Sequence, residues 1–595
     1  MFNRMTAAIV SVLMVLSSSG IGSAADLKDN WGDFLHYTRI GRFDLARAYA
    51  QAILDSSPDP AALFNLTVDN PQDYQLLLRV QEGKPDPELV VAANKVLALV
   101  EQGRQARRSD PRVIIEEIER LASSTERGRM AALKRLQDSG EYAVPLLLDA
   151  LADPAHKDQL DKIVWALPQI GSAAMRPLGA AIQAGNAAVR VEVVRALGKI
   201  GSPEALPYLR YVVEFENTDE VRQVAALGIR QVDPEAGTQS AGALFLKLAE
   251  SYYDRSGSGA TDSGTAGVTN MWFWDADRQK LIRKPVDNRY FHEMMAMRCC
   301  EWALRADSTL GSAIGLWLAS FFKAEAAGIP MPEYFGDRHA DALVYATTAG
   351  PEYLHLALAR AVRDGNVAVA RGAIEALIGT AGEKSIFTPI GSMQPLLQAL
   401  TFKDRAVRTS AAIAVACASP RGQFTESLVV MENLAAAVAV SLEPNAPADV
   451  NVAKYALRSA EAMLSLAQQR NPAFDLSIAQ EALIRASGAG GAELKTVACR
   501  ALAYLGTSAA QQAIADVALK AENGQDLRVV ALEALSVSAK VNGSLLADQT
   551  VNAIYGLIHS GQTEPRLRAA AATAFGSLNL PSRKVKDLIL DQAKS

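Results

Sequence analysis

Few residues in this chain have the types and spacing that catalysis requires. The 595 residues include six histidines, and His292-Glu293 is the one adjacent His-Glu pair. Residues 379–385, GTAGEKS, approach a phosphate-binding loop, but Glu383 interrupts the Gly-Lys-Ser triplet and the first glycine of the pattern is missing. The G-x-S-x-G, H-E-x-x-H and Cys-x-x-Cys patterns are absent. The sequence therefore predicts neither a catalytic residue nor a cofactor.

Two carboxylate clusters have the spacing of a cation site. Asp337 and Asp341 flank His339 and are four residues apart, so on one helix face they could bind a hard cation. Asp275 and Asp277 stand together in an expected turn. Such clusters more often mark a solvated helix start or turn than a metal site. We therefore predict no bound metal.

A cluster of aromatic residues is a candidate partner-binding site. Residues 269–285 read as two short strands around a polar turn, which predicts a β-hairpin in a chain that otherwise favours helices. Trp272, Phe273 and Trp274 lie in its first strand, and aromatic anchors are favoured in binding hot spots. Alternatively, these rings pack onto neighbouring helices and seal an interruption in a helical array.

Arginine recurs early in a repeated segment. Residues 188–201 read AVRVEVVRALGKIG, and the segment recurs with the arginines Arg190, Arg222, Arg408, Arg528 and Arg568. Each arginine comes just after an expected turn, so we expect it to pair with turn carboxylates such as Asp219 or Asp404. The alternative is a ladder of arginines that binds a partner, for which Arg190, Arg222 and Arg408 are the candidates.

The repeated segment alternates with one marked by proline. Val189, Val193 and Leu197 form an apolar stripe at helical spacing. The preceding segment carries a proline that suits a helix start, at intervals of about 30 residues: Pro145, Pro177 and Pro207. One such helical hairpin cannot bury its stripe alone, so neighbouring hairpins must stack and share a core. The predicted fold is all-α, an α-α superhelix (α-solenoid) with a small β-hairpin insertion.

This pattern resembles the HEAT-repeat family, in the short-unit form called PBS-lyase HEAT-like repeats. Residues 145–153, 188–214 and 395–416 carry the resemblance, which is good over 126–235 and looser over 350–595. It implies an adaptor or scaffold rather than a particular activity. Deoxyhypusine hydroxylases hold two irons in such repeats with several His-Glu pairs, a set that this chain lacks.

The remaining helical segments suggest how the chain is organised. Residues 38–64 are similar to a tetratricopeptide helix pair, with a turn at Gly41 and small residues at Ala46 and Ala50, and we expect them to cap the array. The expected segments are a signal peptide (1–25), an N-terminal cap (26–125), a first repeat array (126–237), the hairpin-bearing insertion (238–340) and a second array (341–595).

The N-terminus has the pattern of a secretory signal. Arg4 precedes an apolar run from Ala7 to Leu16, and small residues suit cleavage after Ala24 or Ala25. The run is shorter than the about 20 residues that span a bilayer. We therefore expect an exported protein, periplasmic or extracellular, with no integral membrane segment after cleavage.

Composition limits the remaining function classes. The formal charge is -5, without the basic surface that phosphate neutralisation requires, so nucleic acid is not an expected partner. Four cysteines, Cys299, Cys300, Cys417 and Cys499, are too few for a disulfide framework and are expected to be buried free thiols.

Together these features predict an exported, non-enzymatic interaction scaffold whose groove, lined by second-helix residues, holds a protein or peptide partner. The first alternative is a ligand-binding or enzymatic module centred on 268–341, with a pocket formed by Trp272, Trp274 and His292. The second is an architectural component that self-associates through its ends.

Overall fold

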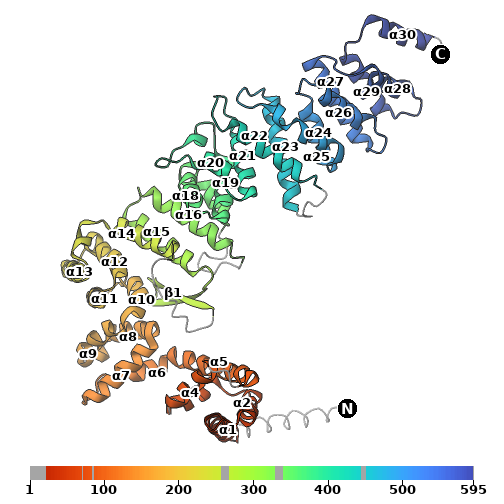
Figure 1. The fold of residues 1–595 in the computed structure, drawn as a ribbon. Helices are drawn as coiled ribbons and strands as arrows, with labels where there is room; N and C mark the ends of the chain where they lie inside the picture. The colour runs from red at the N-terminus through yellow and green to blue at the C-terminus, as the bar shows by residue number, and fades with distance from the viewer. Residues whose placement is uncertain are drawn as a thin grey trace, which may run out of the picture. The chain divides into compact units, whose positions relative to one another are not determined.

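The computed structural model of this protein describes residues 22–69, 71–82, 86–255, 267–328, 340–443 and 450–593. These residues are mostly helical and form two compact units, Met1–Met295 and Ala296–Ser595, whose boundary lies within helix α15 (Phe291–Ala306). Figure 1 shows the succession of helices in each unit. The expected signal peptide up to residue 21, most of the Gly/Ser-rich loop, and Asp337 and His339 lie outside the described residues.

The first unit begins with a helical bundle and continues as stacked helix pairs. Its helices before the hairpin are α1 (Gly22–Arg39), α2 (Phe43–Asp55), α3 (Pro60–Asp69), α4 (Pro71–Glu82), α5 (Pro87–Arg108), α6 (Pro111–Arg120), α7 (Glu126–Ser139), α8 (Ala143–Ala152), α9 (Leu160–Ala166), α10 (Met175–Ala181), α11 (Ala187–Ile200), α12 (Leu206–Phe215), α13 (Asp219–Val232) and α14 (Ala241–Tyr253).

Residues 38–64, for which a tetratricopeptide-like helix pair was expected, contain the end of α1, the whole of α2 and the start of α3. Helices α1 and α2 pack together across the expected turn at Gly41, which has a φ of +74° that favours glycine. Ala46 and Ala50 are fully buried, as expected of small residues between close helices. Helix α5 packs against α2, α3 and α4 and completes a core of its own for this bundle.

The repeat array follows the expected alternation of first and second helices. Pro145, Pro177 and Pro207 all lie in the first turn of a first helix, α8, α10 or α12, where a missing backbone N–H costs no helical hydrogen bond. The second helices α11 and α13 pack side by side, and so do α12 and α14 of the first layer. Helices α11 and α12 thus each contact their own pair partner, α10 or α13, and the equivalent helix of the next unit, which is the contact pattern of a solenoid.

Two glycines of the segment 188–201 have different roles. Gly201 follows the last residue of α11 and adopts the left-handed conformation (φ +73°) that commonly ends a helix. Gly198, however, lies inside the helix, and a Cβ atom placed there would be 2.7 Å from the Cα of Gly228 in α13. Its missing side chain allows two second helices to approach closely.

The expected β-hairpin is confirmed. Strands β1 (Val268–Asp275) and β2 (Lys280–Asp287) pair antiparallel, from Val268 opposite Asp287 to Asp275 opposite Lys280. The hairpin packs against α10 and α8, both first helices, and Figure 1 shows β1 beside α10. Thr269 to Trp272 are buried although successive strand residues face opposite sides, so β1 is covered on both faces there.

The second unit is a longer stack of helix pairs. Its helices after α15 are α16 (Gly311–Glu325), α17 (Ala342–Ala349), α18 (Pro351–Asp364), α19 (Val367–Thr380), α20 (Pro395–Gln398), α21 (Arg405–Ala418), α22 (Ser427–Val440), α23 (Val450–Gln468), α24 (Gln480–Ala489), α25 (Ala492–Leu502), α26 (Ser508–Leu519), α27 (Gln525–Asn542), α28 (Asp548–His559), α29 (Pro565–Ser577) and α30 (Ser582–Ala593).

The two layers of the second unit can be followed by contact. The odd-numbered helices from α19 to α29 each pack on the next one, and the even-numbered helices from α22 to α28 do the same. Leu377, Leu434 and Leu532 are fully buried in the core between the layers. The fold is an all-α solenoid with a small β-hairpin insertion, as predicted. Among the described residues, no helix has both the length and the apolar character needed to cross a membrane.

Candidate functional site

The recurrent arginines bind backbone carbonyl groups at the turn before their own helix. Arg190 Nη1 donates to the carbonyl oxygens of Ala184 (2.6 Å) and Gly185 (2.9 Å), and Arg408 Nη1 donates to those of Phe402 (2.7 Å) and Lys403 (3.1 Å). These carbonyls lie in the turn that follows the preceding first helix, so the guanidinium group pairs with backbone acceptors that the helical hydrogen-bond pattern does not reach.

The same arrangement recurs elsewhere in the array. Arg222 donates to the Glu216 carbonyl (2.9 Å), Arg528 to that of Ala518 (2.8 Å), and Arg568 to that of Thr563 (3.0 Å). Contact of the arginine with a preceding backbone carbonyl therefore belongs to the repeat, although for Arg528 the acceptor is ten residues away, in the last turn of α26.

The carboxylate pairs expected of these arginines form at some positions only. Arg222 pairs with Asp219, as expected, and Arg190 forms a two-point pair with Glu216 (2.8 and 3.1 Å). Asp404, expected beside Arg408, instead accepts a hydrogen bond from the Val407 backbone at the start of α21. Partner binding by Arg190, Arg222 and Arg408 stays a prediction, while these contacts give each of them a structural role.

The hairpin is fixed to the array by one buried carboxylate. Glu141, which precedes α8, is 7% exposed and accepts hydrogen bonds from Asn270 Nδ2 (2.7 Å) and Trp272 Nε1 (2.8 Å). Arg176 Nη2 of α10 approaches the same carboxylate at 3.3 Å. A buried carboxylate is costly unless donors surround it, and here strand β1 and helix α10 supply them.

Tyr142 extends this connection to a third element. Its hydroxyl oxygen is 2.9 Å from Asn270 Nδ2 and 2.7 Å from Gln105 Nε2 of α5. The Arg283 guanidinium of β2 lies 4.8 Å from the centre of its ring. Helices α5 and α10 and both strands thus meet at Glu141 and Tyr142, which we call the Glu141 anchor.

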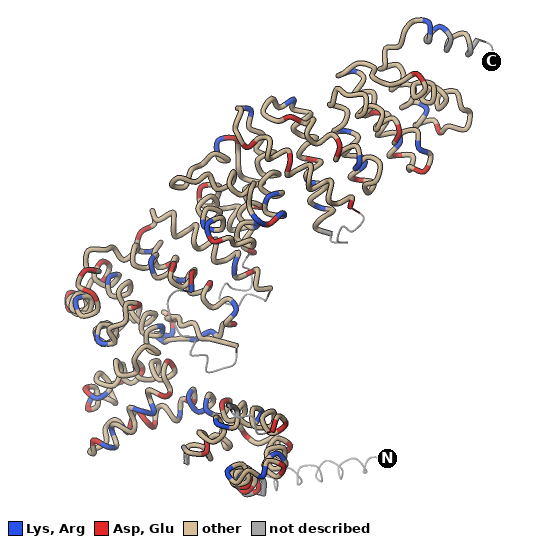
Figure 2. The backbone as a smooth tube through the Cα atoms, in the orientation of Figure 1, with Lys and Arg blue, Asp and Glu red and all other residues tan. Residues whose placement is uncertain are grey.

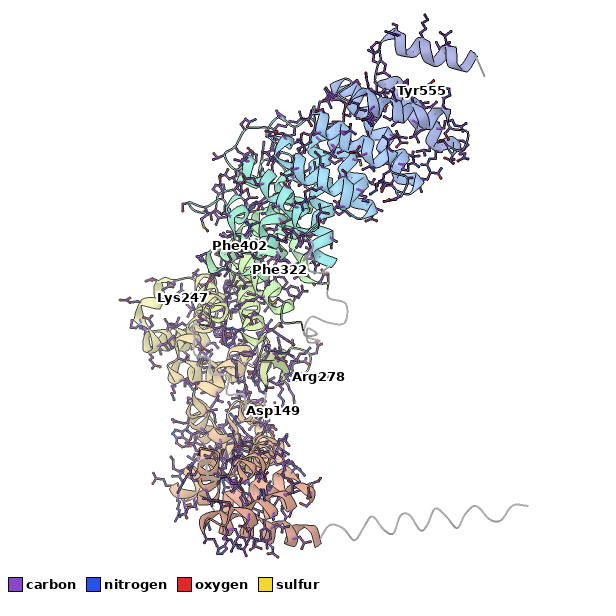
Figure 3. All side chains as sticks on the ribbon, turned by 45° about the vertical axis from the view of Figure 1, so that its right-hand side comes forward. Asp149, Lys247, Arg278, Phe322, Phe402 and Tyr555 are labelled. Atoms are coloured by element: carbon purple, nitrogen blue, oxygen red, sulfur yellow. The ribbon has the colours of Figure 1, made fainter. Side chains whose placement is uncertain are left out.

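The far end of the hairpin is attached to the array as well. Gln279 Oε1 accepts a hydrogen bond from the Gly185 backbone (2.8 Å), between α10 and α11. Lys280 Nζ lies 3.4 Å from Asp149 of α8, and Figure 3 labels Asp149 and the turn residue Arg278. The hairpin therefore lies across successive first helices and holds them in register.

The three aromatic candidates of β1 have different environments. Trp272 is 7% exposed and uses its indole N–H within the chain. Phe273 and Trp274 are half-buried, and Trp274 Nε1 is buried with no hydrogen-bond acceptor among the described residues. Trp272 thus matches the packing alternative. Partner contacts by Phe273 and Trp274 stay a prediction.

A cleft of about 660 Å³ opens on the first-helix side of the array, beside the Glu141 anchor. It crosses several repeat units, because its lining comes from the end of α5, the residue before α8, and the starts of α10 and α12, together with α14. Its volume is in the range of ligand pockets in proteins. The lining residues used below are Arg108, Glu141, Met175, Arg176, Pro203, Glu204, Leu206, Leu244, Lys247, Leu248 and Tyr252.

Apolar and charged side chains share this cleft. Met175, Leu206 and Leu244 are buried in its walls, and Glu141 and Arg176 join it to the hairpin. Burial raises the pKa of the Glu204 carboxyl, against the charge of Arg176 and a hydrogen bond with Tyr252. Both carboxylates are thus engaged by groups of the cleft itself.

Lys247 differs from the other charged residues of the cleft. It lies exposed on α14, where Figure 3 labels it, and the described residues provide it with no counter-ion. Figure 2 shows acidic and basic residues interspersed along both units, without long runs of one sign. The positive charge of Lys247 is therefore a local property of the cleft.

The side chains that the sequence offered for catalysis or metal binding do not come together as a catalytic arrangement in the described parts of the chain. His292 lies 6.3 Å, ring centre to ring centre, from Tyr252, and Trp272, Trp274 and His292 do not line the cleft. Asp275 accepts turn hydrogen bonds from the backbones of Asp277 and Arg278 (3.0 Å each). No cluster of three metal-binding side chains occurs among the residues that the structure describes.

Asp341 and Ser385, two further candidates from the sequence, make contacts within the fold. Asp341 caps the start of α17 by accepting a hydrogen bond from the Val344 backbone (3.0 Å). Ser385, from the stretch compared with a phosphate loop, lies 3.3 Å from Nε2 of the buried His355. Cys417 and Cys499 are free thiols. Cys417 is exposed, contrary to the prediction of buried thiols, whereas Cys299, Cys300 and Cys499 are buried as predicted.

Comparison with known families supports the repeat assignment. The family described as HEAT repeats matches residues 144–230, which contain helices α8 to α12 and most of α13. A search of curated proteins finds no significant match.

Similar solved structures share little sequence with the chain. They include She4p (11% identity, 93% of this chain and 91% of that chain covered, TM-score 0.28) and the myosin chaperone UNC-45 from C. elegans with an Hsp70 peptide (12%, 92% and 81%, TM-score 0.19). Kap95p, in a structure with RanGDP, has 13% identity over 96% of this chain and 69% of its own, with a TM-score of 0.27. Likenesses this low carry no argument about function.

Sequence reasoning missed the residues that build the cleft. Glu141 and Arg176 lie in segments noticed for their prolines, and Lys247 is an isolated lysine in an amphipathic helix. The sequence placed the groove on second helices, whereas this cleft lies on first helices and α14. The signal available in the sequence was a carboxylate just before one first helix, Glu141, and an arginine next to the proline of the following first helix, Arg176.

Proposed function

We propose that the protein is a non-enzymatic interaction scaffold that works outside the cytoplasm and holds a segment of a partner protein in the cleft beside the Glu141 anchor. The match of residues 144–230 to the HEAT-repeat family supports the scaffold role. The observation that carries the proposal is this cleft of about 660 Å³, which crosses several repeat units.

The composition of the cleft supports binding rather than catalysis. Apolar walls with a few charged groups are typical of sites that recognise a ligand. The acid groups Glu141 and Glu204 are engaged with donors of the same site.

A site-specific crosslink tests partner binding at the cleft. A photo-crosslinking amino acid would replace Pro203, an exposed residue of the lining, and in a matched control it would replace Lys199, exposed on the second helix α11. We expect light-dependent adducts with one or a few proteins at position 203 and none of these at position 199, identified by mass spectrometry in the native host. Equal adducts at both positions, or none at 203, would argue against a partner in the cleft.

The location outside the cytoplasm is a separate part of the proposal, supported by the signal pattern from Arg4 to Ala25. Mass spectrometry of the protein from its host should find an N-terminus at Ala25 or Asp26. Replacing two leucines of the apolar run, Leu13 and Leu16, with arginine should leave the full-length chain in the cytoplasm. Recovery of an uncleaved protein in the cytoplasm for the wild type would reject export.

A further inference from the structure

We propose that the cleft recognises the C-terminal carboxylate of a partner protein whose last residue is apolar. The inference rests on the proposed scaffold function and specifies the chemistry of the partner. Its basis is the close placement, on the same helix, of an apolar wall and a cation, Lys247, to which the described part of the chain supplies no counter-ion.

The arrangement on α14 carries the argument. Leu244, Lys247 and Leu248 all line the cleft and are spaced three and four residues apart, so they are neighbours on one helix face. Leu244 is buried, Leu248 is half-buried and Lys247 is exposed, so apolar and charged surfaces adjoin within about one helical turn. A ligand must therefore present an apolar group and a negative charge close together.

The rest of the cleft leaves the positive charge of Lys247 uncancelled. The lining contains two further cations, Arg108 and Arg176, which equal in number its two acidic residues, Glu141 and Glu204. The Glu141 oxygens already accept from Asn270, Trp272 and Arg176, and burial weakens the acidity of Glu204. The start of α12 also lines the cleft and adds the positive end of a helix dipole to these side-chain charges.

A chain terminus fits this pattern better than an internal acidic residue. An apolar C-terminal residue carries its carboxylate and its apolar side chain on the same Cα, so both reach the adjoining surfaces of α14 at once. A Glu or Asp side chain places its carboxylate away from the backbone and needs a neighbouring residue for the apolar contact. Capture of a C-terminal carboxylate by positive groups is an established mode of peptide recognition.

The test compares peptides that differ in one charge. One pool of fluorescent hexapeptides ends in Leu, Ile, Val, Phe or Met with a free carboxylate, and the second pool is identical but amidated. A third, amidated pool carries an internal Glu beside an apolar residue. Retention of each pool on the full-length protein without its signal peptide is measured by mass spectrometry. We expect the free acids to be retained about tenfold more than the amides, the effect of one charge-assisted hydrogen bond.

Matched variants locate the effect. Lys247→Glu should abolish the preference for free acids and Lys247→Arg should keep it. Lys199→Glu, an equally exposed change on the second helix α11, should also keep it. Equal retention of acids and amides by the wild type, retention of the internal-Glu pool as strong as that of the free acids, or an unchanged preference in Lys247→Glu would overturn the proposal. If crosslinking at Pro203 still succeeds in that case, the scaffold function stands and only the carboxylate specificity fails.

Discussion

At the scale of single residues, burial separates side chains that look alike in the sequence. Trp272 and Trp274 are two positions apart in the same strand, but only the Trp272 indole N–H has an acceptor among the described residues, the buried Glu141 carboxylate. The two tryptophans therefore offer a comparison in which ring size is held constant and one hydrogen bond differs.

We predict that Trp272→Phe destabilises the first unit by about 1–3 kcal/mol, the cost of removing one hydrogen-bond donor from a buried carboxylate. Trp274→Phe should cost clearly less, because it removes an indole N–H that has no acceptor in this structure. Urea unfolding of each variant, followed by circular dichroism, gives the two values. A larger loss for Trp274→Phe would contradict the anchoring role of Glu141.

His355 predicts a dependence of stability on pH. Its ring is fully buried in α18 and burial lowers its pKa from 6.5 to about 4. In the unfolded chain the imidazole takes up a proton below pH 6.5, whereas in the folded chain it does so only near pH 4. The free energy of unfolding is therefore at its full value above pH 6.5 and decreases as the pH falls toward 4. The loss by pH 4 is about 3 kcal/mol, at 1.36 kcal/mol for each unit of pKa.

The measurement is urea unfolding at pH 7 and pH 4.5 for the wild type and for His355→Gln. The variant should lose less stability than the wild type between these two pH values. His36→Gln, at an exposed histidine of α1, is the control and should behave as the wild type does. An identical pH dependence in the wild type and in His355→Gln would show that the buried imidazole does not stay neutral.

At the scale of helices, the sequence predicts the features that neighbouring residues determine, namely where helices start and end and where the hairpin forms. Pro145, Pro177 and Pro207 marked first helices because proline suits only the first turn, and Gly201 marked a helix end because it accepts a left-handed conformation. The hairpin was also predictable, since its strands and its turn adjoin in the sequence.

Contacts between distant segments could not be read in the same way. Glu141 and Trp272 meet across 131 positions of the chain, and nothing in either local pattern indicates the other. Arg190 shows an intermediate case, because its recurrence was visible but its acceptors, the Ala184 and Gly185 carbonyls, depend on how the turn folds. Lys247 gave no signal at all, since its importance lies in the residues that other helices bring beside it.

Gly198 yields a prediction at this scale. Replacing a glycine inside a helix with alanine normally raises the free energy of unfolding by up to about 1 kcal/mol, because the unfolded chain becomes less flexible. At Gly198 the added Cβ would meet the Cα of Gly228 at 2.7 Å, so α11 and α13 must move apart.

We expect Gly198→Ala to destabilise the protein by about 1–3 kcal/mol, as overpacking does. Gly32→Ala in α1, where a Cβ would meet nothing within 4 Å, should instead be neutral or stabilising. Thermal unfolding measures both changes, and opposite signs are the expected result. A stabilising effect at Gly198 would mean that the two second helices are not in close contact.

At the scale of the whole molecule, the contact pattern determines how far a perturbation spreads. Each helix pair contacts its sequence neighbours, and the two compact units have cores of their own. In such a chain the stability is close to a sum of repeat and nearest-neighbour contributions, so regions open separately.

We therefore predict local responses to local overpacking, measured by hydrogen exchange with mass spectrometry. Gly198→Ala should increase exchange in α11, α13 and adjoining helices, and leave α25, α27 and α29 unchanged. Gly372→Ala, where the added Cβ would overlap the Phe322 ring, should affect α16, α19 and α21 and leave α11 and α13 unchanged. Helices α11 and α13 are the perturbed region in one variant and the control region in the other. A uniform increase in exchange in both variants would therefore show that the chain unfolds as one cooperative body, and nearest-neighbour coupling would then be the wrong description of this solenoid.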